Sequence, residues 1–120
     1  FRYPEIYKTG ISIAAVGNQL TYDNIYQERY MGLPAENRAD FVKGSPVTYA
    51  RNLKGNLLYI HGTGDDNVHW QNSAEMINAM IKSGAQYDSE VYPNRNHGIG
   101  DRAASYHLYR RMTRFILEKL

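Results

Sequence analysis

Short apolar runs, spaced between longer mixed segments, set the pattern of this chain. Residues 9–16 (TGISIAAV) and 56–61 (NLLYIH) are continuous rather than alternating, and the first is rich in β-branched side chains. Runs of this length and kind are typical of strands that are buried on both faces of a parallel sheet. Residues 86–92 (QYDSEVY) are expected to form a third strand, although they are not a continuous apolar run.

Helical patterns fill the segments around these strands. A short helix is expected from Thr21 to Tyr30, with Thr21 as its N-terminal cap and a stop at Gly32. A second helix should end near Ser83, because the glycine that follows suits the left-handed position after a helix. The clearest helix spans residues 102–119. Each of these last two helices has one apolar face. In the helix that ends near Ser83 it consists of Ala74, Ile77, Met80 and Ile81, and in the helix 102–119 it consists of Ala104, Leu108, Met112, Phe115 and Ile116.

The order of these elements predicts the architecture. Strands that alternate with helices are typical of an α/β fold, a parallel sheet covered by helices. Residues 35–55 interrupt the alternation as a loop-rich excursion with room for two short helical turns. Three strands make a thin sheet and the chain opens on Phe1, so we expect a segment of a larger domain.

Composition removes several classes of protein. The 120 residues carry 14 Lys and Arg against 12 Asp and Glu, a net charge of +2, which is too small to indicate a nucleic-acid or membrane-surface protein. The chain has no cysteine, which excludes disulfides, thiol catalysis and thiolate metal sites. No apolar run approaches the roughly 18 residues of a membrane span.

Titratable residues follow two of the predicted strands. HGTGDDNVHW (residues 61–70) comes after the second strand, and PNRNHG (93–98) comes after the third. Ligands of parallel α/β sheets bind at the carboxyl ends of the strands, so neighbouring strands would bring Asp65 and His97 together. A carboxylate that orients an imidazole is half of an acyl-transfer triad, and the order Asp then His is that of α/β-hydrolases.

The loop after the second strand also allows three simpler interpretations. Asp-Asp-Asn after a strand is common in turns and at helix caps. This role accounts for the pattern as well as the triad interpretation does. A metal site could use His61, Asp65, Asp66 and His69, although they match no recognised ligand spacing. The glycines before Asp65 give only G-x-G, without the third glycine or the Lys-Ser/Thr pair of a phosphate loop.

A nucleophile is not visible in the sequence. The nucleophile elbow of α/β-hydrolases is G-x-S-x-G on a strand-to-helix turn. The nearest match is GISIA around Ser12, which lacks the second glycine and lies inside a strand-like run. If the chain belongs to a serine hydrolase, we expect its serine to lie upstream of Phe1.

Three motifs together carry a resemblance to a known family. YDNIYQERYMGLP (22–34), LLYIHGTGDDNVHWQNS (57–73) and YPNRNHGI (92–99) resemble the C-terminal part of the prolyl oligopeptidase family, most closely its dipeptidyl peptidase IV branch. The resemblance covers about residues 7–120. It implies that residues 1–120 are the C-terminal segment of a peptidase α/β-hydrolase domain, about three parallel strands with covering helices, with the nucleophile elbow and a β-propeller lying upstream.

The resemblance also implies roles for particular residues. Asp65 matches the triad aspartate and His97 the general base. The substrate pocket would be formed by the aromatic walls Tyr22 and Tyr26, the aliphatic lining Val16 and Val68, and Asn67, which matches a side chain that hydrogen-bonds a substrate carbonyl. Four-residue spacing would place both tyrosines on one helix face, and flat rings suit a proline ring. The alternative is that Tyr22, Tyr26 and Tyr30 pack as a core stripe.

The chain departs from the family pattern in two respects. Gln19 stands where the branch often has an aromatic residue, three positions before the first pocket tyrosine. The nucleophile, the oxyanion-hole tyrosine and the acidic residues that hold the substrate's amino terminus are absent from these residues. Specificity for dipeptides is therefore inferred from the resemblance alone.

The expected function is that of part of a serine exopeptidase. It would release N-terminal dipeptides with Pro or Ala at the penultimate position and would be inactive as an isolated segment. The expected partners are peptide substrates, the upstream part of its own catalytic domain and, in one arrangement, a second copy as a homodimer. No cofactor, metal or nucleic acid is expected, and a periplasmic, cell-surface or secreted location is favoured over the cytoplasm. The alternative is a non-catalytic α/β-hydrolase-like module for binding or oligomerisation.

Overall fold

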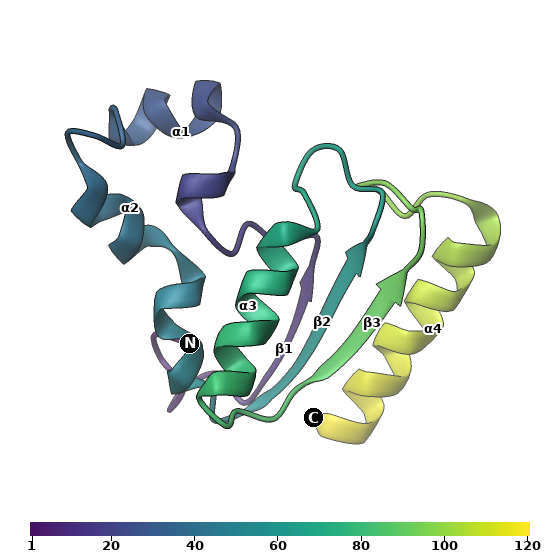
Figure 1. Cartoon of the computed structure of the whole chain (residues 1–120). Helices are drawn as coiled ribbons and strands as arrows, with labels where there is room; N and C mark the ends of the chain where they lie inside the picture. Colours follow the sequence, from purple (N-terminus) through teal and green to yellow (C-terminus); the bar gives the residue numbers. More distant parts are fainter.

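The computed structural model describes all residues from Phe1 to Leu120. Three strands alternate with helices, as the sequence predicts (Figure 1). In chain order the elements are β1 (Thr9–Ile13), the 3-10 helix η1 (Gln19–Thr21), α1 (Asn24–Met31), α2 (Arg38–Gly44), the 3-10 helix η2 (Pro46–Asn52), β2 (Asn56–Gly62), α3 (Gln71–Lys82), β3 (Asp88–Tyr92) and α4 (Arg102–Lys119).

The sheet is parallel and has the order β1-β2-β3. The central strand β2 is almost completely buried, whereas β1 and β3 are only partly covered. Successive residues of a strand point to opposite faces, and β2 shows this clearly. Leu58 and Ile60 pack with residues of α4, and Leu57 and Tyr59 pack with residues of α3, so these helices cover opposite faces of the sheet (Figure 1).

The first strand is shorter than the predicted span of 9–16. It ends at Ile13 because Ala14 adopts a left-handed backbone with a φ of 48°, which an extended strand cannot continue. The N–H of Ala14 still donates to the carbonyl of Ile60 at 2.9 Å. Residues 14–18 then leave the sheet edge and lead to the predicted pocket residues.

The predicted helix 21–30 begins later than expected. Thr21 closes η1, and α1 starts at Asn24. Asp23 is its cap, because its carboxylate accepts hydrogen bonds from the N–H groups of Ile25 and Tyr26. The predicted cap was wrong because an aspartate two residues further on satisfies the free N–H groups of the first turn. The two short helical turns expected in 35–55 are present as α2 and η2.

The buried face of α3 agrees only in part with the apolar face that the sequence predicts: Met80 is buried and Ile77 packs against the same cluster. Ala74 is exposed and Ile81 is 61% exposed. The side chains that pack inward are Asn72, Ser73, Met76 and Met80. A pattern of apolar residues cannot reveal two buried polar side chains that are satisfied by partners far away in the chain.

The predicted face of α4 agrees better with the structure. Ala104, Leu108 and Phe115 are buried, while Ile116 is 43% exposed. Asp101 caps the helix, accepting from the N–H of Ala104 at 3.0 Å. None of the helices is both long enough and apolar enough to cross a membrane.

Candidate active site

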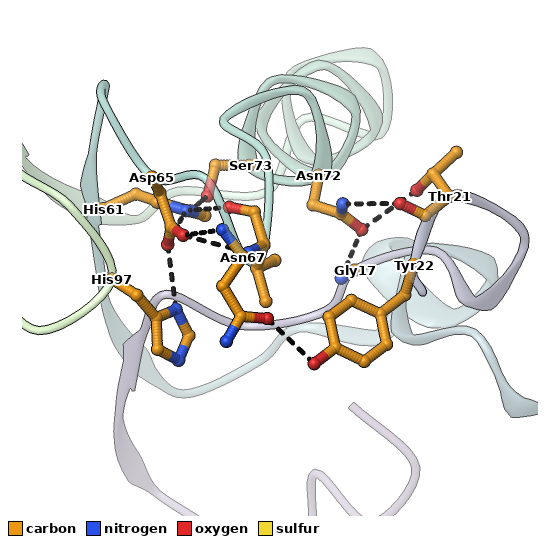
Figure 2. Close-up of polar contacts among 10 residues, drawn as sticks. Gly17, Thr21, Tyr22, His61, Asp65, Asn67, Asn72, Ser73 and His97 are labelled. Atoms are coloured by element: carbon orange, nitrogen blue, oxygen red, sulfur yellow. Dashed lines mark hydrogen bonds and ion pairs between the residues drawn. The ribbon is translucent and has the colours of Figure 1, made fainter. Parts of the chain in front are cut away.

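The loops that follow β2 and β3 meet at the carboxyl end of the sheet and bring Asp65 against His97. The Nδ1 atom of His97 lies 2.9 Å from Oδ2 of Asp65 (Figure 2). The two residues are 32 positions apart in the chain, and the parallel pairing of β2 with β3 brings them together. The contact expected from the sequence is present, and Asp65 makes it rather than the exposed Asp66.

Asp65 is buried and its carboxylate is held from several sides. Its Oδ1 accepts from the backbone N–H groups of Asn67 and Val68, both at 2.9 Å. Its Oδ2 faces His97 and also Nε2 of His61, at 3.0 Å. Burial alone raises the pKa of Asp65, but the hydrogen bonds from His97 and the two N–H groups outweigh it, so the net pKa lies below the usual range. The carboxylate is therefore ionised at neutral pH.

Two glycines allow the loops to approach this closely. A Cβ atom at Gly62 would collide with the carbonyl oxygen of Arg95, and one at Gly64 would lie 3.1 Å from the carbonyl carbon of Asn94. Gly64 donates its N–H to the carbonyl of Arg95 at 3.0 Å, and the hydroxyl of Thr63 accepts from the N–H of Asn94 at 2.8 Å. The G-x-G that the sequence analysis compared with a phosphate loop is where the backbone after β2 packs against the backbone of Asn94 and Arg95.

The loop of His97 is anchored by a buried residue in an unusual conformation. Ile99 has a φ of 46°, which is costly for a β-branched residue. Its side chain is fully buried in the cluster that includes Leu58 and Phe115, and its carbonyl accepts from the hydroxyl of Ser105. Apolar burial therefore holds the loop that presents His97.

His61 lies behind the Asp65–His97 pair and is buried, with 1% exposure. Its Nε2 faces Asp65 and also the carbonyl of Val68 at 2.8 Å, while its Nδ1 meets the hydroxyl of Ser73. The sequence raised His61 only as a metal ligand. Its supposed partners Asp66 and His69 are exposed, and the chain brings together no group of three His, Asp or Glu side chains that could hold a metal ion.

Two of the predicted pocket residues, Asn67 and Tyr22, lie beside His97. The hydroxyl of Tyr22 donates to Oδ1 of Asn67 at 2.9 Å, and Figure 2 shows His97, Asn67 and Tyr22 in a row on one side of the site. The rings of Tyr22 and Tyr26 meet edge to face, with centroids 5.9 Å apart. Tyr22 precedes α1 rather than sharing its face, which corrects the spacing argument.

The remaining predicted pocket residues differ in exposure. Tyr26 and Tyr30 are 56% and 68% exposed, so the alternative of a core stripe does not hold in this chain. Val16 is partly buried. Val68 is only 3% exposed, and its backbone N–H and carbonyl contact Asp65 and His61.

Asn72, which sequence reasoning missed, fixes the loop that leads to Tyr22. Its side chain is fully buried, and its carbonyl oxygen accepts from the N–H groups of Gly17 and Asn18 and from the hydroxyl of Thr21, each at 3.1 Å. Figure 2 shows the contacts of Asn72 with Gly17 and Thr21 on the opposite side of the site from His97. A polar residue in the first turn of a helix gave no signal of such long-range contacts.

The arrangement has the geometry of an acid-oriented base. His97 has one ring nitrogen on a buried carboxylate, its side chain is 45% exposed, and no hydrogen bond occupies its other nitrogen, Nε2. No serine of the chain is hydrogen-bonded to His97. The only serine that hydrogen-bonds a histidine is Ser73, and its partner is the buried His61. The pair can therefore take a proton from a hydroxyl that another segment supplies.

A parallel sheet with helices on both faces, and with an acid and a histidine on the loops after successive strands, defines part of an α/β-hydrolase domain. The comparison with protein families extends this assignment. The model of the prolyl oligopeptidase family matches residues 1–120. The chain belongs to that family, in the branch of dipeptidyl peptidase 4.

Individual relatives agree with this assignment. The chain is 40% identical over 114 residues to dipeptidyl peptidase 4 of Sus scrofa, covering 92% of this chain and 15% of the relative. It is 35% identical over 117 residues to "inactive dipeptidyl peptidase 10" of Rattus norvegicus, again 15% of that protein. The crystal structure of Porphyromonas gingivalis dipeptidyl peptidase 4 superimposes with a TM-score of 0.96 and 36% identity, over 99% of this chain and 17% of that chain. The chain thus spans about 15% of the length of these curated relatives.

Proposed function

We propose that this chain is the C-terminal segment of the catalytic domain of a serine exopeptidase that releases dipeptides from peptide N-termini, with Pro or Ala at the penultimate position. It supplies Asp65 and His97 of a Ser-Asp-His triad and part of the proline pocket. The observation that carries the proposal is the 2.9 Å contact between a buried carboxylate and Nδ1 of a half-exposed histidine.

In this mechanism His97 moves the protons and Asp65 keeps the ring in place. Nε2 of His97 takes the proton of the serine hydroxyl as the serine oxygen bonds to the scissile carbonyl carbon. The imidazolium then gives that proton to the leaving nitrogen as the C–N bond breaks. Nε2 next takes a proton from the water that attacks the acyl carbon, and it returns this proton to the serine oxygen as the ester bond breaks. Throughout, Asp65 accepts the Nδ1 proton, which keeps Nε2 free and stabilises the positive ring.

Asn67 and the two tyrosines suit the substrate side of the site. Because Oδ1 of Asn67 accepts from the hydroxyl of Tyr22, its Nδ2 amide group is free to donate to a substrate carbonyl, and it points the same way as Nε2 of His97 (Figure 2). The edge-to-face rings of Tyr22 and Tyr26 offer apolar walls for a proline ring. Val16 and Val68 complete this pocket in the proposal.

The upstream part of the same domain is the required partner. The nucleophile, the oxyanion-hole donor and the acidic residues for the substrate's amino group belong, in this proposal, to the portion of the relatives that the chain does not cover. The isolated segment is then inactive, because it has no serine beside His97. Peptides are the substrates, and a homodimer of the parent is compatible with the proposal.

A non-catalytic module is the second candidate. It is favoured by one observation, the similarity to a relative whose printed name is "inactive dipeptidyl peptidase 10". A parent of this type would keep the sheet and its loops for binding or oligomer contacts. It would lack the nucleophile, and the Asp65–His97 contact would then serve only to hold the two loops together.

Turnover by the full-length parent separates these candidates. The wild-type parent should cleave a Gly-Pro anilide, and His97→Ala should remove nearly all of this activity with little change in melting temperature. Blocking the substrate's amino group should abolish cleavage by an exopeptidase and spare cleavage by an endopeptidase. Tyr26→Ala should raise KM for the proline substrate. A folded wild-type parent without turnover would support the binding module instead.

A further inference from the structure

The proposed mechanism leaves one buried titratable group unused, the imidazole of His61. Its two ring nitrogens touch Asp65, the carbonyl of Val68 and the hydroxyl of Ser73. The ring of Trp70 meets it edge to face at 5.7 Å. A histidine with so little access to water and with every nitrogen occupied needs a specific reason to be there.

The contacts of His61 determine which nitrogen carries its proton. Nε2 lies between two acceptors, Oδ2 of Asp65 at 3.0 Å and the carbonyl oxygen of Val68 at 2.8 Å. Two acceptors require a hydrogen on that nitrogen. Nδ1 is then free to accept from the hydroxyl of Ser73, so this hydrogen-bonding arrangement is satisfied by a neutral ring.

This arrangement is not a second triad, although it contains Ser, His and Asp. In a triad the serine lies on Nε2 and the acid on Nδ1; here Ser73 lies on Nδ1 and Asp65 on Nε2. Ser73 and His61 are also both buried, so no substrate could reach the hydroxyl. The hydrogen bonds instead form a series from the buried Ser73 through His61 and Asp65 to the half-exposed His97.

The same oxygen of Asp65 serves both histidines. Its Oδ1 is occupied by two backbone N–H groups, whereas Oδ2 faces His61 on one side and His97 on the other. The backbone donors fix one oxygen, and the carboxylate could still tilt about that anchor. The N–H of His61 restrains Oδ2 against such a tilt and so keeps this oxygen facing Nδ1 of His97.

We propose that His61, held by Ser73, is a positioning residue of the peptidase: its Nε2–H fixes the carboxylate of Asp65 in the orientation that aligns His97. The proposal deepens the proposed function and rests on it. His61 touches no reacting atom, so its removal should lower the rate of the chemical step and leave substrate binding nearly unchanged.

The test uses the full-length parent and three substitutions around His61. His61→Leu removes the donor, and His61→Gln returns an N–H group near the position of Nε2. Ser73→Ala keeps the imidazole but frees its far side, and it serves where His61→Leu does not fold. Met80→Ala is the matched control, because Met80 is fully buried on α3, the helix that carries Ser73, and has no hydrogen bond to His61 or Asp65.

The first readout is the kinetics of cleavage of a Gly-Pro anilide, measured beside melting temperatures. His61→Leu should lower kcat about ten- to a hundredfold, the range for loss of an orienting partner in an outer shell, with KM near the wild-type value. Ser73→Ala should have a smaller effect in the same direction, and His61→Gln should restore most of the loss. Met80→Ala should lower the melting temperature and leave kcat unchanged.

The second readout does not depend on turnover. The proton between His97 and Asp65 should give a low-field proton NMR resonance at low pH, identified by its loss in His97→Ala. It should vanish or shift in His61→Leu and return in His61→Gln. If the wild-type parent has no turnover, the proposed function fails, and the resonance still decides the positioning role.

Three outcomes would overturn the inference. One is a folded His61→Leu with wild-type kcat and an unchanged resonance. Another is a loss of kcat that Met80→Ala reproduces at the same melting temperature, which would mark a purely structural effect. The third is a His61→Leu variant that changes KM alone while His61→Gln fails to restore it.

Discussion

Gly62→Ala in the full-length parent should separate the loops that carry Asp65 and His97 with a single methyl group. The new Cβ would lie 2.8 Å from the carbonyl carbon of Arg95, where carbon atoms normally stay about 3.5–4.0 Å apart. The loops must therefore part by roughly 1 Å. The 2.9 Å contact between Asp65 and His97 would lengthen to about 3.9 Å, beyond the range of a hydrogen bond.

A misplacement of this size at a catalytic group costs about 10²-fold in rate, so we expect kcat for a Gly-Pro anilide to fall by about that factor. Gly100→Ala is the control. Gly100 belongs to the same loop as His97, a Cβ there would meet nothing within 4 Å, and its φ is not in the left-handed region. This variant should retain wild-type kcat and melting temperature.

Wild-type turnover in a folded Gly62→Ala variant would refute the reasoning. It would mean either that the loops tolerate the methyl group without moving, or that the alignment of Asp65 with His97 does not limit the rate. A crystal structure of the variant would distinguish these, because the distance from Oδ2 to Nδ1 is the quantity in question.

Three further predictions concern stability, the pocket and the sheet edge. Because the folded pKa of Asp65 is depressed, its charge stabilises the fold above about pH 4, the pKa of an unfolded aspartate, and this stabilisation is lost as the pH falls through the lower folded pKa. The urea midpoint of the parent should therefore fall with pH in this range, and Asp65→Asn should reduce the fall. Asn72→Ala leaves the buried N–H of Gly17 without its acceptor, which should cost about 1–3 kcal/mol and raise KM as the loop to Tyr22 loosens; unchanged melting and KM would contradict the role of Asn72. Expressed alone, the chain should self-associate along β1, which pairs on one side only; sedimentation as a monodisperse monomer would count against this.

The sequence predicted the parts of the fold that depend on local patterns. Continuous apolar runs predicted β1 and β2, residues 86–92 were expected to form the third strand, and glycines predicted where two of the helices end, because these signals act within a few residues. The meeting of Asp65 with His97 was also predictable, since the carboxyl ends of neighbouring parallel strands share one edge of the sheet. The end of β1 was not, because nothing in the residues around Ala14 announces a left-handed backbone.

The buried polar contacts lay beyond prediction for a different reason. Asn72 and Ser73 follow no apolar period, and each is satisfied by residues that are distant in the chain: Gly17 and Asn18 for the first, His61 for the second. Burial of a polar side chain is stable only when all of its partners are in place. The signal therefore exists in the folded molecule and not in any short stretch of sequence.

The adjacent placement of Asn72 and Ser73 has a consequence for engineering. One turn of α3 holds the loop of Tyr22 through Asn72 and contacts Asp65 through Ser73 and His61. In the proposed peptidase, substrate preference and rate would therefore both depend on the position of this one turn. A substitution that tilts this turn would change both properties at once. For the proposed peptidase, libraries that aim to alter selectivity without slowing turnover should leave residues 71–73 untouched and vary Tyr26 instead, whose side chain is exposed.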